Sequence, residues 1–278
     1  MTQRSRLLLI GGVTLAAIAG MWDLPPIPQS QDYHRFADQR AFLGIPNFLN
    51  VISNAAFLLV GAMGLSFLWR RRGSGPESSF AEGSEQWPYV IFFLGVALTG
   101  LGSGYYHLAP DNARLVWDRA PMSVAFMSIL AALATERISV KAGRLSLFPL
   151  VAAGIGSVWY WRLTELGGRG DLRPYIIVQF YPTVAIPLIM LLFPSRYSRS
   201  ADLLGAGATY GVAKAFEAAD AQVFAVGRIA SGHTLKHITA ALATYLILRM
   251  LWRRRLLLLE VPEEASRGES PEGALHEK

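Results

Sequence analysis

The chain has 278 residues, of which 52% are hydrophobic and only 17% are charged, whereas soluble globular domains carry about 25% charged residues, so a membrane protein is expected. It contains no cysteine, which excludes disulfides and thiolate metal sites. The net charge of +6 does not indicate a nucleic-acid partner, because the basic residues cluster beside apolar runs, as they do in the loops of membrane proteins.

Apolar runs predict the helices of the fold, and most of them reach the ~17–25 residues that a bilayer core requires. In chain order these runs are 7–22, 47–69, 88–108, 115–135, 145–161, 174–193, 202–217 and 230–252. The runs at 7–22 and 202–217 are the weakest. The predicted fold class is an all-α, polytopic membrane protein with a seven-helix bundle core and an additional N-terminal hydrophobic helix.

The first run has two interpretations. Arg4 and Arg6 precede it, and Ala17 and Ala19 form a pattern typical of signal-peptide cleavage, but we favour a retained anchor. The predicted segments are an N-terminal anchor or signal-like segment (1–24), a seven-helix membrane domain (25–255) and an acidic, disordered tail (256–278).

Basic residues of the loops predict the topology. If the chain crosses at every run, one side receives Arg4 and Arg6; Arg70, Arg71 and Arg72; Arg137, Lys141 and Arg144; Arg196 and Arg199; and Arg249, Arg253, Arg254 and Arg255. The other side receives only scattered arginines. Because lysine and arginine mark cytoplasmic loops, both chain ends are predicted to be cytoplasmic if the first run is retained.

Polar residues from three separate runs are then predicted to lie at one depth, near the non-cytoplasmic face. His107 ends the third run, Asp118 lies in the first turn of the fourth, and His233 and His237 open the last. Ionisable residues inside a membrane are expensive and are functional in most cases, so the convergence indicates a site.

Spacing within this group suggests metal chemistry. His233 and His237 are four residues apart and share a helix face, and His107 can supply a third nitrogen. Three histidines with an open fourth position are typical of catalytic zinc. Ser103 lies four residues before His107 and can hydrogen-bond a water or a substrate oxygen, while Asp118 can accept a proton or orient a ligand.

Each of these residues also has a simpler interpretation. The histidines can be hydrated interface residues, Asp118 can be an acid that the helix dipole favours, and Ser103 can serve close helix packing. Weaker candidates for the site lie elsewhere. Asn47, Asn50, Ser53 and Asn54 open the second run, where we expect the asparagines to bond neighbouring helices rather than line a cavity; Lys214 and Glu217 are expected to pair or to reach the interface.

Two stretches resemble motifs of the alkaline ceramidases. One is "GSGYYHLAPDNARLVWDRAPM", which is similar to their Ser-x-x-x-His and Asp-x-x-Pro-Met signature; the other is "GHTLKH", which is similar to their C-terminal His-x-x-x-His. "NFLNVISN" resembles the opening of their first core helix. The similarity runs from about Asn47 to Trp252, and the site residues also resemble those of the wider superfamily with adiponectin-receptor-like membrane hydrolases.

The resemblance implies a zinc-dependent amidohydrolase that cleaves a ceramide-like N-acyl lipid of the membrane. Its zinc would be held by His107, His233 and His237, with Asp118 and Ser103 supporting the chemistry. The chain departs from the family at two places. Arg119 stands where the family has an acid, and Asn47 aligns with a glutamate of the family's calcium site, with only Asp32 and Asp38 nearby, so calcium binding is left open.

Two other function classes use the same residues. A seven-helix receptor or sensor would hold a structural zinc, and a fourth protein ligand would favour it over the enzyme. A transporter or channel fits less well, because carriers place their sites near the membrane midplane. The acyl-chain length, the lipid headgroup and the oligomeric state are not determined by the sequence.

Overall fold

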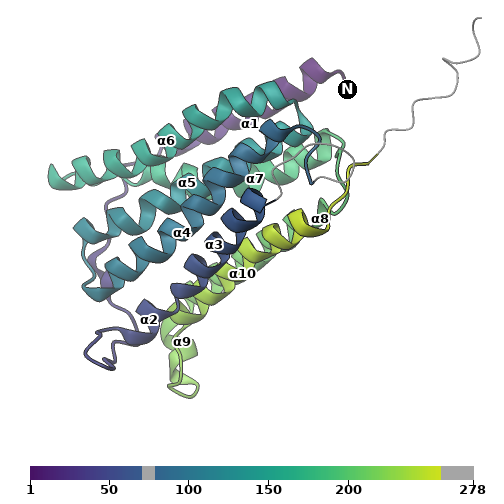
Figure 1. The fold of residues 1–278 in the computed structure, drawn as a ribbon. Helices are drawn as coiled ribbons and strands as arrows, with labels where there is room; N and C mark the ends of the chain where they lie inside the picture. Colours follow the sequence, from purple (N-terminus) through teal and green to yellow (C-terminus); the bar gives the residue numbers. More distant parts are fainter. Residues whose placement is uncertain (71–78, 258–278) are drawn as a thin grey trace, which may run out of the picture.

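The structure is a computed structural model that describes residues 1–70 and 79–257, and all regular secondary structure in these ranges is helical. The helices are α1 (Gln3–Trp22), α2 (Phe48–Ile52), α3 (Ala55–Arg70), α4 (Trp87–Leu108), α5 (Asn112–Arg137), α6 (Val140–Leu166), α7 (Arg173–Leu192), α8 (Ala201–Ala218), α9 (Asp220–Ala225) and α10 (Gly232–Arg253), with 3-10 turns η1 (Gln31–His34) and η2 (Gly83–Gln86) (Figure 1). The predicted all-α class is confirmed.

Six helical stretches of the described chain are long and apolar enough to cross a membrane. They are Gln3–Trp22, Phe48–Arg70, Gly83–Leu108, Asn112–Arg137, Val140–Leu166 and Arg173–Leu192. This set fits a multi-pass membrane protein. Helices α8 and α10 fall outside it; α8 carries Asp202, Lys214 and Glu217, and α10 opens with histidines and Lys236. They pack against each other within the bundle, so a core of seven spans stays a prediction.

Every predicted run contains a helix, and the second run is broken. Its helix is interrupted at Ser53 and Asn54, which separate α2 from α3. Asn47, just before α2, adopts a left-handed backbone conformation with φ of 48°. Capping side chains begin two helices of the site: Asp111 accepts from the N–H of Arg114 at α5, and Ser231 accepts from the N–H of Thr234 at α10.

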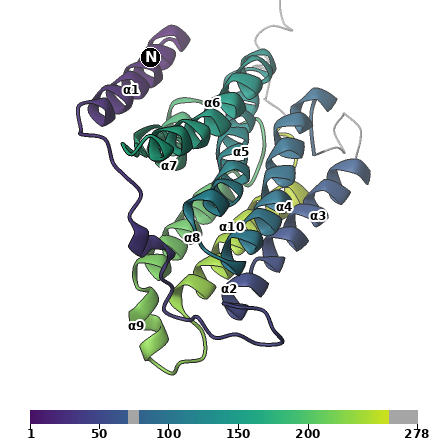
Figure 2. The same ribbon diagram turned by 90° about the vertical axis from the view of Figure 1, so that its left-hand side faces the viewer.

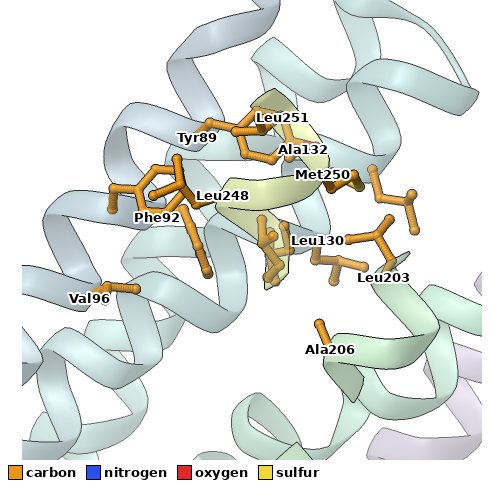
Figure 3. Packing of buried hydrophobic residues seen from close by; sticks show 14 of the residues in the cluster. Tyr89, Phe92, Val96, Leu130, Ala132, Leu203, Ala206, Leu248, Met250 and Leu251 are labelled. Atoms are coloured by element: carbon orange, nitrogen blue, oxygen red, sulfur yellow. The ribbon is translucent and has the colours of Figure 1, made fainter. Parts of the chain in front are cut away.

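Helices α4 and α5 form the centre of the bundle. α4 packs against both α3 and α5, and α5 packs against α6 and α7. A core cluster of apolar side chains joins them to α8 and α10 (Figure 3). Helix α1 lies apart beside α7 and has no buried residue (Figure 2). Outward-facing residues such as Leu191 and Phe148 are more than three-quarters exposed, as expected for side chains in contact with lipid.

The basic clusters that fall within the described ranges gather at one end of the bundle. There Arg254 pairs with Glu136, which also accepts the hydroxyl of Tyr89, and Arg196 pairs with Glu85. Helices α2 and α9 lie at the opposite end (Figure 1). Arg71, Arg72 and 258–278 of the predicted tail lie outside the described residues. Leu257, near the end of the described residues, donates its N–H to the carbonyl of Arg196.

Cysteine labelling tests the predicted sidedness, because the natural chain has no cysteine to give background. Val226→Cys places a thiol just after α9, where the side chain is 84% exposed. Lys141→Cys places one at the exposed start of α6, at the basic end. We expect an impermeant maleimide to label Val226→Cys in intact cells and Lys141→Cys only after permeabilisation. The reverse pattern would contradict the predicted orientation.

Candidate metal centre and cavity

Three histidines from two helices meet at the end of the bundle opposite the basic clusters. His107 lies in the last turn of α4, and His233 and His237 lie in the first two turns of α10. All three are buried, and one ring nitrogen of each lies within 4.8 Å of those of the others. The predicted convergence of these residues is therefore observed.

The hydrogen bonding of these rings fits a metal ion. His107 Nδ1, His233 Nε2 and His237 Nε2 are buried and have no hydrogen-bond partner among the described residues. Buried polar atoms are paired in nearly all proteins, because an unpaired one costs free energy. A cation that accepts the three lone pairs would remove this cost. Neutral imidazole suits zinc, copper, iron and nickel, so the group itself does not determine which metal binds.

Side chains at the break between α2 and α3 hold His237 in place. Ser53 Oγ lies 2.8 Å from His237 Nδ1, and Asn54 Nδ2 lies 3.4 Å from the same nitrogen. Since Nδ1 is engaged there, Nε2 is the nitrogen that faces the other histidines. Asn47 donates to the carbonyl of His107, and Asn50 accepts from Thr234. The expectation that these asparagines bond neighbouring helices is confirmed.

Removing the Ser53 hydroxyl is expected to weaken metal binding without abolishing it. In Ser53→Ala, His237 Nδ1 loses its closest partner, and the ring loses the contact that fixes its orientation. Changes of this kind typically lower metal affinity ~10–100-fold. Competition of the purified variant with a zinc chelator measures the effect. Ser66→Ala, on an exposed face of α3, is the matched control and should retain wild-type affinity; an unchanged affinity in Ser53→Ala would contradict the assigned role.

A cavity of about 320 Å³ opens beside the histidines, between α3, α4, α5, α7, α8 and α10. His237, Ser103 and Asp118 line its polar end, and most of the remaining wall is apolar, including Phe92, Met122 and similar side chains deeper in the bundle. The volume lies in the range of small-molecule sites. Apolar walls with a few polar groups at one end suit an amphiphile with a long chain.

Ser103 and Asp118 lie on neighbouring helices, and both line this polar end of the cavity. Both side chains are buried. Helices α4 and α5 approach each other closely here, because a side chain on Gly102 would collide with the carbonyl of Trp117. Of the five residues predicted for the site, His107, His233 and His237 form the histidine cluster, and Ser103 and Asp118 line the cavity together with His237.

One sequence-based expectation for Asp118 is wrong. The residue was placed in the first turn of its helix, but α5 begins at Asn112 and is capped by Asp111. Asp118 consequently lies in the second turn with a 5% exposed side chain. The interpretation of Asp118 as an acid that merely starts a helix loses its basis.

Lys236 is a site residue that the sequence analysis missed. It lies directly before His237, lines the cavity, and its Nζ is 2.7 Å from Glu217 Oε1. Glu217 also pairs with Lys214, as expected. The sequence signal for Lys236 was its position between two histidines in an apolar run, because a charged side chain in such a run needs a partner of opposite charge. Gly232 lets α10 reach α8, because a side chain there would collide with the carbonyl of Phe216.

The segment between α1 and α2, called the covering segment, runs across this end of the bundle (Figure 2) and contacts the histidines through Phe36. The ring of Phe36 lies 4.6 Å from that of His107 and 4.5 Å from that of His233, measured between centroids. Asp220 joins the segment to α10 by accepting the N–H groups of Ala37 and His233. These contacts exclude water from one side of the cluster.

Arg119, which departs from the family motif, anchors this covering segment. It is buried, donates to the side chain of Gln29, and lies against the rings of Tyr33, Trp161 and Tyr175 at 4.6–5.4 Å. Tyr33 and Gln29 belong to the covering segment. The positive charge at 119 therefore serves cation–π contacts that an acid could not make.

The two aspartates near the family's calcium position are each engaged by an arginine. Asp38 accepts two bonds of 2.8 Å from Arg40, and this side-chain contact holds the pKa of Asp38 below its usual range. Asp32 pairs with Arg35 in an exposed position. The two carboxylates are thus bound separately to arginines rather than to a shared centre.

The chain matches no protein-family model, no curated protein and no solved structure. The chemistry of the site is therefore the basis for a functional assignment.

Proposed function

We propose that the protein is an intramembrane zinc hydrolase that cleaves the amide bond of a ceramide-like N-acyl lipid and releases a fatty acid. The observation that carries the proposal is the set of three buried imidazoles with unpaired nitrogens beside an apolar cavity. In this assignment, α1 is additional to a seven-helix core, the site lies near the non-cytoplasmic face, and the chain belongs with the alkaline ceramidases that its motifs resemble.

Each residue has a defined task in this reaction. His107, His233 and His237 hold the metal, and a bound zinc ion would activate water and polarise the scissile carbonyl. Asp118 accepts the proton of the attacking water and passes it to the leaving amine. The Ser103 hydroxyl, which lines the same cavity, orients the Asp118 carboxylate. The apolar part of the cavity receives the acyl chain directly from the bilayer.

The alternative is a receptor or sensor with a structural zinc site. Structural sites are closed by four protein ligands, whereas catalytic sites use three and keep one position open. The histidine group offers three ligands, and the adjacent pair of Ser103 and Asp118 borders the cavity. These features favour the enzyme.

Metal content and lipid hydrolysis, measured on one preparation, test the proposal. We expect about one zinc ion per chain, the number that a three-histidine site accommodates. Fatty-acid release from a small panel of N-acyl lipids should stop when the metal is chelated and return when zinc is added. Bound zinc without hydrolysis of any panel member would point to the receptor alternative. Failure of the protein to bind zinc that is supplied in excess would overturn both the hydrolase and the receptor.

A further inference from the structure

The polar end of the cavity carries two ammonium groups that the proposed reaction does not use. Lys214 on α8 and Lys236 on α10 both line the cavity. They share one carboxylate: Glu217 binds Lys236 through Oε1 and Lys214 through Oε2. The side chain of Lys214 is 31% exposed, so its ammonium group is the less enclosed of the two.

The charges around the cavity leave room for an anion. Lys214 and Lys236 share the single carboxylate of Glu217, so this group carries one positive charge more than its acid neutralises. Asp118 is the other acid that lines the cavity, and the proposed reaction uses it as the proton acceptor. Charges interact strongly in such an apolar environment, so an anionic group on the bound molecule would be stabilised there.

We propose that the lipid amide carries a carboxylate on its amine half, so that the substrate class is an N-acyl amino acid, and that Lys214 binds this carboxylate with Lys236 beside it. The inference rests on the proposed hydrolase function and narrows its substrate. In an N-acyl α-amino acid the carboxylate lies two bonds from the amide nitrogen. Lys214, Lys236 and the candidate ligand His237 all line the same cavity, so the carboxylate and the amide of one substrate can lie within it together.

The reaction balances with water as the only co-reactant. The amide C–N bond breaks, the water oxygen joins the acyl carbon, and a proton passes through Asp118 to the amine nitrogen. The products are a fatty acid and a free amino acid. Lys214 takes no part in these bond changes; it determines which amine half is accepted.

A matched pair of probes tests the inference. N-palmitoylglycine and N-palmitoylethanolamine share the acyl chain and the amide, and differ in a carboxylate against a hydroxymethyl group. Binding is measured on the detergent-solubilised full chain after removal of metal, and hydrolysis is measured after zinc is restored. We expect N-palmitoylglycine to bind ~10-fold more tightly to the stripped protein, as a charge-assisted bond replaces a neutral one. The kcat/KM for N-palmitoylglycine should exceed that for N-palmitoylethanolamine by at least the same factor.

Variants test whether Lys214 causes the preference for N-palmitoylglycine. Lys214→Met should bind the two probes equally, and Lys214→Arg, which retains the charge, should keep the preference for N-palmitoylglycine. Lys141→Met, an exposed lysine at the opposite end of the bundle, should behave as wild type. Loss of the preference in Lys214→Met but not in Lys141→Met supports the assignment, and its retention in Lys214→Met overturns it.

The wild-type measurements keep the inference testable if Lys214→Met does not fold. Equal binding of the two probes by wild type overturns the carboxylate site, even if both are hydrolysed. Tight binding of palmitate together with equal binding of the two amides also overturns it, because the lysines would then recognise the fatty-acid carboxylate. A clear preference in binding with no hydrolysis would support the carboxylate site and count against the proposed function.

Discussion

Replacing His233 or His237 by alanine is expected to remove most of the bound zinc and to reduce lipid-amide hydrolysis to background. Each variant leaves two imidazoles, and two nitrogens do not complete the three-ligand set of a catalytic zinc site. The two histidines lie on the same face of α10, so either change removes a ligand without altering the other helices. Metal analysis of the purified variants, at the same protein concentration as wild type, measures the loss.

A control separates ligand loss from general damage to this end of the bundle. His34 lies in the covering segment and bonds Tyr106 and Asn112 instead of facing the three-histidine cluster. His34→Ala should keep its zinc, although it removes the same ring from a nearby position. Full zinc retention in His233→Ala or His237→Ala, with normal elution in gel filtration, would rule out the ligand assignment.

The meeting of the histidines at one end of the bundle was predictable, because membrane helices have a nearly fixed length. When apolar runs of similar length alternate in direction, the end of one and the start of the next lie at the same face. His107 and His233 follow this rule directly. The histidine spacing on α10 then required only the helical repeat of 3.6 residues.

Other parts of the site depended on contacts that a linear pattern does not contain. The break between α2 and α3 coincides with the bond from Ser53 to His237, a residue 184 positions away. The pairing of Lys236 with Glu217 depends on how α8 and α10 are rotated about their axes, and hydropathy does not specify that rotation. Phe36 reaches the histidines through an irregular segment, for which no periodic pattern exists.

Arg119 shows how tertiary contacts change the meaning of a motif. By comparison with the family signature, a basic residue beside Asp118 looks like a defect in the site. In the structure the guanidinium lies against the rings of Tyr33, Trp161 and Tyr175, which do not line the cavity, whereas Asp118 does. Arg119 therefore helps attach the covering segment and leaves the Asp118 carboxylate available for chemistry.

Asp118→Asn is expected to lower lipid-amide turnover by ~100-fold or more while the protein keeps its zinc and its fold. Asparagine has nearly the same size, and its side-chain oxygen remains a hydrogen-bond acceptor. What disappears is the basicity needed to take a proton from water and return it to the leaving amine. Thermal unfolding of the variant should match wild type, because this buried position keeps a polar side chain of the same shape.

Zinc content and fatty-acid release from one preparation of Asp118→Asn distinguish the remaining roles. If Asp118 only positioned a metal ligand, zinc affinity would fall along with the rate, by the ~10–100-fold typical of such partners. If Asp118 moves protons, the rate falls and the affinity does not. Ser103→Ala is the companion variant: it keeps the carboxylate but removes the hydroxyl that orients it, so its rate should fall less than that of Asp118→Asn. Near-normal hydrolysis by Asp118→Asn would exclude the proton-transfer role, and the Ser103 hydroxyl would then be the remaining polar group of this pair that can assist the reaction.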